Sequence, residues 1–321
     1  MNIDDAASLD SSFPLPLDAP FTRRQAIAAG LSDRRLRLLV DRHQLRRPAA
    51  GVYVAARVPD SIELRAQVIL LTAPPGCFVC DETAAWLHGA TMALAPNSHL
   101  FVPKVCFFRP ADAGRIRTSI AASGERSVAD DDLMLVGGVL TTTPLRTACD
   151  LGRLRRRDHA LAAMDALLSL GVFTREELLA AIAKFAKQRG VRQLRWLAPL
   201  ADGRSESYGE SVLRLRWYDA GLPTPQLQIS VVVDGSELFR LDIGLEELLF
   251  AAEYNGEEWH SSPLQVQRDA TRRSWLEEER GWWIEEFTKV SVHGHDQDAD
   301  FRLRHAFEES RRRRGNPTII A

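Results

Sequence analysis

Cysteine and long apolar stretches are both scarce in this sequence, and their scarcity excludes several classes of protein. The 321 residues include 4 cysteines, and Cys77-x-x-Cys80 has no second pair to complete a zinc or disulfide framework. No apolar run approaches the ~20 residues that a membrane-spanning helix needs, and the amino terminus lacks the basic and apolar segments of a secretion signal. We therefore expect a cytoplasmic protein without a membrane segment, whose cysteines are reduced and buried.

The two ends of the sequence differ in charge. Residues 1–20 carry four aspartates among serines and prolines, which predicts a disordered leader. Residues 21–57 contain nine arginines against two aspartates, a local balance of +7. From residue 201 to the end, fifteen basic residues stand against twenty-three acidic residues, a balance of −8. A basic part joined to an acidic part suggests that one end binds a polyanion and that the other requires a cation.

Residues 21–57 have the pattern of a winged helix-turn-helix. Residues 22–30 predict a capped helix that ends at glycine, residues 33–42 predict a second helix, and residues 44–56 predict a hairpin. This stretch, with its closing Gly51-Val52-Tyr53-Val54, resembles the amino-terminal domain of AbiEi-type abortive-infection antitoxins. In that arrangement the second helix enters the major groove of double-stranded DNA.

The arginines of this stretch are the candidate DNA-binding residues. Arg34, Arg35 and Arg37 on the second helix would contact bases or phosphates, and Arg46 and Arg47 on the wing would contact the DNA backbone. The alternative is that these side chains only solvate a small helical domain, or that the domain binds protein. So many arginines with so few acids in one short segment favour DNA.

Residues 58–200 predict a middle α/β region with a helical connector. Helices are expected at 81–89, 141–151, 160–170 and 175–187, and a strand at 100–105. The first two of these helices resemble the middle portion of AbiEi-type proteins. His88 lies on an apolar helix, and we expect it to be a core histidine and not a ligand.

Two acidic residues stand in apolar strands of the last third. Residues 226–234, 238–243 and 248–256 predict an antiparallel meander that contains Asp242 and Glu253. A carboxylate among apolar neighbours must be hydrogen-bonded, paired or bound to a metal. Each acid could instead lie on a wetted face of the sheet or pair with an arginine.

An ordered series of polar residues surrounds these two acids. It runs through Ser207-x-x-Glu210, Arg240-x-Asp242, Glu253-Tyr254-Asn255-Gly256, His260 and Asp269-x-x-Arg272-Arg273. The series resembles the PD-(D/E)XK nuclease superfamily and, more narrowly, its Vsr-like endonuclease branch. The resemblance implies a restriction-endonuclease-like mixed sheet flanked by helices, in which Glu210, Asp242 and Glu253 hold Mg²⁺ (or Mn²⁺). It further implies that His260 moves a proton and that Asp269 with Arg272 shapes the phosphate site.

Several features of this region leave alternatives open. Asn255 replaces the lysine of the superfamily, which the Vsr-like branch also lacks, and Glu286 stands near the position of a basic residue in that branch. Ser207-x-x-Glu210 also fits a capping box, and an intrahelical ion pair would explain the charges of the last motif. A turn at Leu245-Glu246 would separate Asp242 from Glu253 by roughly 13 Å, so we expect a twist or bulge to bring them together.

These observations predict an α/β protein of several domains. A winged helix-turn-helix at 21–57 and a middle region at 58–200 precede a nuclease-like domain at 201–310 and a basic tail at 311–321. The favoured function is a metal-dependent endonuclease or nickase acting on double-stranded DNA. The alternative is an AbiEi-like antitoxin and transcriptional repressor with an inactive nuclease-like domain and a toxin-antitoxin or defence partner.

Overall fold

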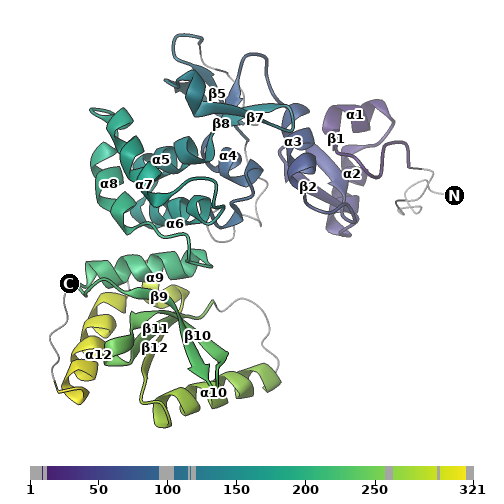
Figure 1. The fold of residues 1–321 in the computed structure, drawn as a ribbon. Coiled ribbons are helices and arrows are strands. Elements are labelled where there is room, and N and C mark those ends of the chain that lie inside the picture. Colours follow the sequence, from purple (N-terminus) through teal and green to yellow (C-terminus); the bar gives the residue numbers. More distant parts are fainter. Residues whose placement is uncertain are drawn as a thin grey trace.

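Three β-sheets follow one another along the chain, each accompanied by helices (Figure 1). The computed structural model describes residues 9, 13–93, 105–114, 116, 121–256, 263–294 and 297–315. The combination of helices with parallel and antiparallel strands confirms the predicted α/β architecture. In the described part of the chain, every helix is too short or too polar to cross a bilayer.

The amino-terminal sheet carries two helices and a hairpin, in the order that the sequence pattern predicts. Its elements are β1 (Phe21–Thr22), α1 (Arg23–Ala28), α2 (Asp33–Asp41), β2 (Leu45–Ala49) and β3 (Val52–Ala55). Thr22 and Ser32 cap the two helices by accepting backbone hydrogen bonds. Gly30 ends the first helix with a φ of 87°, a backbone conformation that favours glycine.

The helices of this unit pack on one face of its sheet. Leu36 and Leu39 form the core with Phe21. Phe13 and Leu15 pack against the same core, and the rings of Phe13 and Phe21 are 6.0 Å apart. The prediction of a disordered leader over residues 1–20 is therefore wrong for Phe13 and Leu15, because burial of their apolar side chains offsets the cost of ordering the backbone.

The opposite face of the same sheet is buried as well. Val52 and Val54 lie in one cluster with Leu64, Val79 and Phe107 of the middle part. All four residues of β3 are buried. Apolar contacts on both faces of the sheet therefore fix the helix-and-hairpin unit against the middle part of the chain.

The middle sheet has five strands in the order β6-β5-β4-β8-β7. Its strands are β4 (Phe78–Val79), β5 (Val105–Pro110), β6 (Ala121–Arg126), β7 (Leu133–Val136) and β8 (Val139–Thr142). Helices α3 (Ile62–Leu70) and α4 (Asp81–Leu87) accompany it. The strand predicted at 100–105 lies outside the described residues except for its last position, where β5 begins.

A layer of helices follows the middle sheet (Figure 1). It consists of α5 (Pro144–Leu154), α6 (Arg157–Leu168), α7 (Arg175–Ala181) and α8 (Val191–Leu197). The helix predicted at 141–151 begins only at Pro144, because Thr141 and Thr142 end strand β8. The helix predicted at 175–187 ends early and continues as a 3₁₀ turn, Ile182–Phe185.

The carboxy-terminal sheet has four strands in the order β12-β11-β10-β9. Its elements are α9 (Tyr208–Asp219), β9 (Gln226–Val233), β10 (Ser236–Leu245), β11 (Phe250–Tyr254), α10 (Pro263–Glu278), β12 (Trp283–Phe287), α11 (Lys289–Val292) and α12 (Ala299–Arg313). Strands β9, β10 and β11 form the predicted antiparallel meander, and β12 pairs in parallel with β11.

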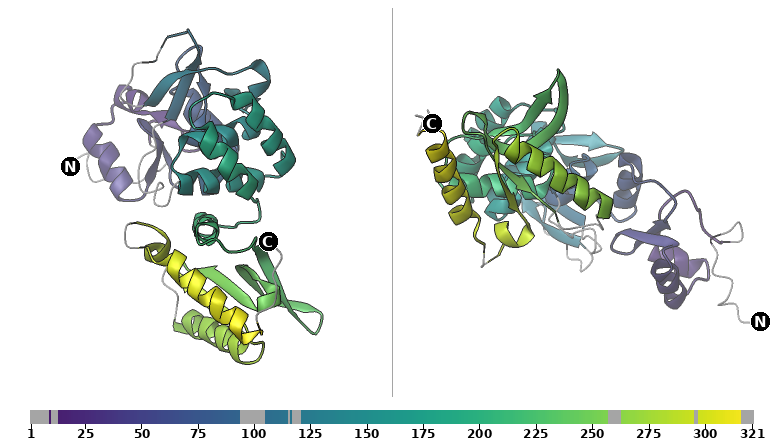
Figure 2. Two further views of the ribbon diagram at one scale, coloured as in Figure 1. Left: turned by 90° about the vertical axis from the view of Figure 1, so that its left-hand side faces the viewer. Right: turned by 90° about the horizontal axis from the view of Figure 1, so that it is seen from below.

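Helix α9 lies between the middle helices and the carboxy-terminal sheet (Figure 2). Leu215 packs in the core of the middle helices, whereas Val212, Leu213 and Trp217 pack in the core of the carboxy-terminal sheet. One helix therefore contributes to both cores.

Candidate functional site

Asp242 and Glu253 lie opposite each other on neighbouring strands. The pairs Ile243↔Ala252 and Gly244↔Ala251 fix the register of β10 and β11, and the next position along the ladder aligns Asp242 with Glu253. Opposed residues of antiparallel strands point to the same face of the sheet. The separation of roughly 13 Å that a turn at Leu245-Glu246 would impose does not arise, and the expected distortion is not needed because β10 and β11 pair without a register shift.

The cause is a longer connection than a tight turn at Leu245-Glu246. A 3₁₀ turn, Glu246–Leu248, follows β10, and Leu249 adopts the left-handed backbone conformation with a φ of 48°. The added residues move the partner of Asp242 from Leu249 to Glu253. A leucine at positive φ is unusual, so the length of this turn could not be predicted from its residue types.

Each of the two acids has its own hydrogen-bond partner. Oδ2 of Asp242 accepts the backbone N–H of Tyr254 at 2.8 Å. Oε1 of Glu253 pairs with a guanidinium nitrogen of Arg272 at 2.6 Å, and the same nitrogen donates to the carbonyl of Arg240 at 3.0 Å. These residues line a cavity of about 220 Å³.

Glu210 approaches the same acids from helix α9. Ser207 caps the helix by accepting the N–H of Glu210 at 3.1 Å. The Glu210 carboxylate accepts the backbone N–H of Glu206 at 2.8 Å and the side-chain amide of Gln228 at 3.0 Å. The capping interpretation is therefore correct for Ser207, but the carboxylate reaches back one residue beyond the cap and also contacts β9.

Burial makes these carboxyl groups weaker acids. It raises the pKa of Glu210 to about 7, and the charge of nearby Asp242 adds to the increase. Burial also raises the pKa of Asp242 to about 6, against the opposing effect of the Tyr254 hydrogen bond. The pKa of Glu253 is raised by burial, although Arg272 counteracts the shift. Burial thus favours the protonated form of all three carboxyl groups.

The structure does not gather Glu210, Asp242 and Glu253 into a set of three whose ligand atoms all lie within 4.8 Å of one another. Mg²⁺ needs several oxygen ligands gathered around one point. Among the described residues, one set of three offers ligand atoms that all lie within 4.8 Å of one another, and it is Asp81, Glu82 and Cys106. Glu253 already pairs with Arg272, so its charge is compensated without a metal.

The remaining predicted catalytic residues are only partly placed. His260 lies outside the described residues, and so does the side chain of Asp269, whose backbone belongs to α10. Arg273 pairs with Glu286 at 2.8 Å and, within its helix, with Glu277 at 3.0 Å. Arg273 therefore has an intrahelical partner in Glu277, whereas the predicted pairing with Asp269 stays a prediction because that side chain lies outside the described residues.

The predicted DNA-binding arginines differ in their exposure. Arg34 and Arg37 are exposed on α2, three residues apart and hence on one side of the helix. Arg47 is exposed on β2, with its guanidinium 5.7 Å from the ring centre of Tyr53. Arg35 is half-buried, and half-buried Arg46 donates to the carbonyl of Val58 at 2.9 Å. Of the five predicted DNA-binding arginines, Arg34, Arg37 and Arg47 are therefore the exposed ones.

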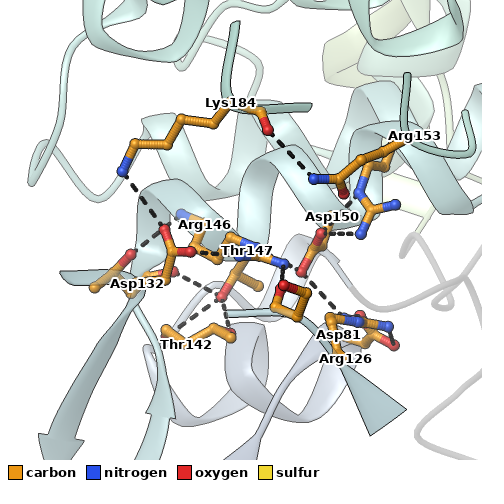
Figure 3. A network of polar contacts seen from close by, with 12 residues as sticks. Asp81, Arg126, Asp132, Thr142, Arg146, Thr147, Asp150, Arg153 and Lys184 are labelled. Carbon is orange, nitrogen blue, oxygen red and sulfur yellow. Dashed lines mark hydrogen bonds and ion pairs between the residues drawn. The ribbon is translucent and has the colours of Figure 1, made fainter. Parts of the chain in front are cut away.

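Sequence reasoning missed a buried polar cluster in the middle part (Figure 3). Asp150 on α5 is fully buried and accepts hydrogen bonds from Arg126 at 3.1 Å, Arg146 at 2.9 Å and Arg153 at 2.8 Å. The spacing of Arg146, Asp150 and Arg153 on one helix was the available signal. Arg126 lies on β6 and could not be predicted as a partner from residue spacing, because only the fold brings it close to α5.

The charges of this cluster are balanced. Its arginines are Arg126, Arg146, Arg153 and Arg155, and its acids are Asp81, Glu82, Asp132 and Asp150. Burial disfavours ionised Asp81, but the ion pair with Arg126 more than offsets that cost, so the pKa of Asp81 is lowered. Burial raises the pKa of Cys106 to about 11. Paired acids beside a protonated thiol make a metal site here unfavourable.

His88 and the cysteines of the middle part are structural. A ring nitrogen of His88 lies 2.7 Å from the carbonyl oxygen of Thr142, as expected for a core histidine. All four cysteines are free thiols, and all but Cys77 are buried. The sequence expectation of buried, reduced cysteines is met by three of them.

Comparison with known proteins finds similarity along much of the chain. Residues 76–200 match the AbiEi antitoxin C-terminal domain. Two proteins of Mycobacterium tuberculosis, MT2308 of strain CDC 1551 and Rv2248 of strain H37Rv, are each 36% identical over 234 residues, which cover 73% of this chain and 82% of the relative. The match to the crystal structure of the RV2827C protein from Mycobacterium tuberculosis covers 68% of this chain and 84% of that chain, at 12% identity and a TM-score of 0.31.

The AbiEi match confirms one part of the predicted resemblance and not the other. Residues 76–200 lie within the middle region, 58–200, for which an AbiEi-like domain was predicted, whereas the AbiEi-type resemblance of residues 21–57 lies outside the matched residues. The match spans the five-stranded sheet and the helical layer that contain the buried arginine cluster.

Proposed function

We propose that this chain, which belongs to the same protein family as Rv2248 of Mycobacterium tuberculosis, is a DNA-binding regulator of the antitoxin type. The observation that carries the proposal is the match of residues 76–200 to the AbiEi antitoxin C-terminal domain, in a chain whose basic winged-helix unit packs against the same region. The proposal assigns DNA binding to the winged-helix unit at the amino terminus. It assigns recognition of a toxin partner to the antitoxin-like domain at residues 76–200.

The contacts between these two units support a regulatory role. Val52 and Val54 of the wing pack into the cluster formed by Leu64 and Val79, so the DNA-binding surface and the antitoxin domain share a core. The DNA-binding unit therefore has a fixed orientation relative to the domain that would bind the partner, so binding at one could affect binding at the other. Exposed Arg34 and Arg37 supply the charge for phosphate contacts.

DNA binding by the purified full chain tests this proposal. Its affinity for the DNA upstream of its own reading frame is compared with that for unrelated DNA over a range of salt concentrations. Arg34→Ala and Arg37→Ala should weaken binding and reduce the salt slope by ~0.9 for each phosphate that the variant no longer neutralises. Arg192→Ala, which removes an exposed arginine on α8, is the matched control. Equal binding by all variants would refute the assignment.

The toxin partner is tested in cells. The neighbouring reading frame is expressed alone and together with this chain, and growth is measured. Restoration of growth by the full chain supports an antitoxin. If growth arrest persists at matched expression levels, the partner assignment is wrong even where DNA binding holds.

A second candidate function is cleavage of DNA that depends on Mg²⁺ or Mn²⁺. One observation favours it, the register that aligns Asp242 with Glu253 beside a cavity. The pairing of Glu253 with Arg272 opposes it. Supercoiled plasmid is incubated with the full chain and either ion, beside Asp242→Asn and the exposed control Glu278→Gln. Nicking that Asp242→Asn alone abolishes would establish the nuclease, and intact plasmid in every reaction would exclude it.

A further inference from the structure

Strand β7 is an apolar edge strand. It lies at one end of the five-stranded sheet (Figure 1), and within the described residues β8 is its one strand partner. Met134 is 38% exposed and Leu135 is 67% exposed, and Leu140 of β8 is 39% exposed. An open edge with exposed apolar side chains offers both hydrogen-bond groups and hydrophobic surface to another strand.

The turn between β7 and β8 determines which backbone groups face outward. Gly137 and Gly138 both have positive φ, 54° and 83°, as a two-residue hairpin turn with the right twist requires. The flanking residues Val136 and Val139 are then a hydrogen-bonded pair, and Leu135 with Leu140 a non-hydrogen-bonded pair. The N–H and C=O of Leu135 therefore point away from β8.

Two further hydrogen bonds agree with this alternation. The N–H of Thr143 donates to the carbonyl of Asp132 at 2.8 Å, at a position where the ladder should be hydrogen-bonded. The N–H of Leu133 donates to the carbonyl of Asp130 in the turn that precedes the strand. Leu135 is thus the residue of β7 that presents both a donor and an acceptor to the open edge.

We propose that the occupant of this edge is a second copy of the chain, paired antiparallel through β7 about a twofold axis at Leu135. A single residue with an outward donor and an outward acceptor is complementary to itself, because the two copies exchange both bonds. The same symmetry brings the exposed side chains of Leu135 and Leu140 of both copies together on one face. The pairing joins two five-stranded sheets into one continuous sheet.

The charges beside the strand select the antiparallel arrangement. Exposed Asp130, and Asp131 with its partner Lys184 at 2.9 Å, precede β7, whereas the uncharged turn at Gly137 and Gly138 follows it. Antiparallel pairing about Leu135 aligns the acidic end of each copy with the apolar turn end of the other. Parallel pairing would place the two acidic ends side by side, where like charges destabilise the pair.

Sedimentation velocity of the full chain over a range of concentrations tests the proposal. The wild-type chain should show a concentration-dependent dimer. Leu135→Pro removes the outward N–H without removing a bond to β8, a position where an edge strand tolerates proline. Leu135→Lys keeps the backbone and adds a charge to the edge. Both variants should raise the dimer dissociation constant at least about tenfold.

A matched control and a folding check complete the experiment. Val232→Lys alters a residue of β9 that is 49% exposed and should leave the dimer unchanged. Circular dichroism and thermal melting establish whether each variant is folded. If Leu135→Pro does not fold, Leu135→Lys decides the outcome. A wild-type chain that stays monomeric, or a dimer that persists unchanged in folded Leu135→Lys, overturns the proposal. Neither result depends on DNA binding, so the proposed function is judged separately.

Discussion

Arg214 on α9 and Asp165 on α6 form an ion pair whose side chains are 2% and 0% exposed. Asp165 also accepts the backbone N–H of Asp202 at 2.8 Å. Burial raises the pKa of Asp165 against the opposing charge of Arg214. The pair joins α6 of the middle part to α9, the helix that carries Glu210.

Removal of one partner of this pair should lower the free energy of unfolding far more than removal of both. Arg214→Met leaves a buried carboxylate without its cation and should lower the free energy of unfolding by about 3–5 kcal/mol. The double variant Asp165→Asn/Arg214→Met should recover much of this loss, because the amide still accepts the Asp202 bond without a charge. Urea unfolding at pH 7 measures both. A double variant no more stable than Arg214→Met would show that the charge is not the cause.

Glu210 should make the protein less stable as the pH rises. Its pKa is about 7 in the folded chain against an ordinary value of 4.5, so between these values the folded state binds more protons than the unfolded state. Stability from this group is therefore full below pH 4.5 and is lost toward pH 7, by up to roughly 3 kcal/mol. Urea unfolding from pH 4.5 to 8 should show a flatter profile for Glu210→Gln. Exposed Glu278→Gln is the control and should retain the wild-type slope.

Gly209 leaves the space that the ring of Tyr254 fills. A Cβ at this position would lie 1.9 Å from Cε1 of Tyr254, so Gly209→Ala must displace the Tyr254 ring. The backbone N–H of the same residue donates to Asp242. We expect a loss of about 1–3 kcal/mol from overpacking, measured by thermal unfolding. Gly256→Ala is the control, because its Cβ would meet the same ring at an ordinary 3.6 Å. Equal melting temperatures for both variants would contradict this packing.

The stability of the buried arginine cluster in the middle part should depend on the charge of Asp150. Asp150→Asn leaves Arg126, Arg146 and Arg153 around a neutral group in a buried site. We expect the free energy of unfolding to fall by about 3–5 kcal/mol. The matched substitution Asp131→Asn, at a carboxylate 69% exposed beside Lys184, should cost less than about 1 kcal/mol. Chemical denaturation compares the two. A small effect of Asp150→Asn would mean that the arginines find other acceptors.

Local patterns were sufficient for much of the fold. The caps at Thr22, Ser32 and Ser207 and the turn glycines could be recognised because they act within one or two turns of a helix. The meander was visible from alternating apolar residues. Leader residues Phe13 and Leu15 were assigned wrongly, because their order depends on a core built by residues farther along the chain.

The sequence by itself determined which side chains carry charge, where the helices of the amino-terminal unit begin, and that Asp242 and Glu253 lie in apolar strands. Only the tertiary structure decided that these two acids face each other, that Arg272 compensates one of them, and that three arginines surround Asp150. Residue spacing governs contacts within a helix or strand, whereas the length of the turn at Leu249 and the packing of α9 bring distant segments together. An ionisable group therefore acquires its pKa and its partner only when the whole chain has folded around it.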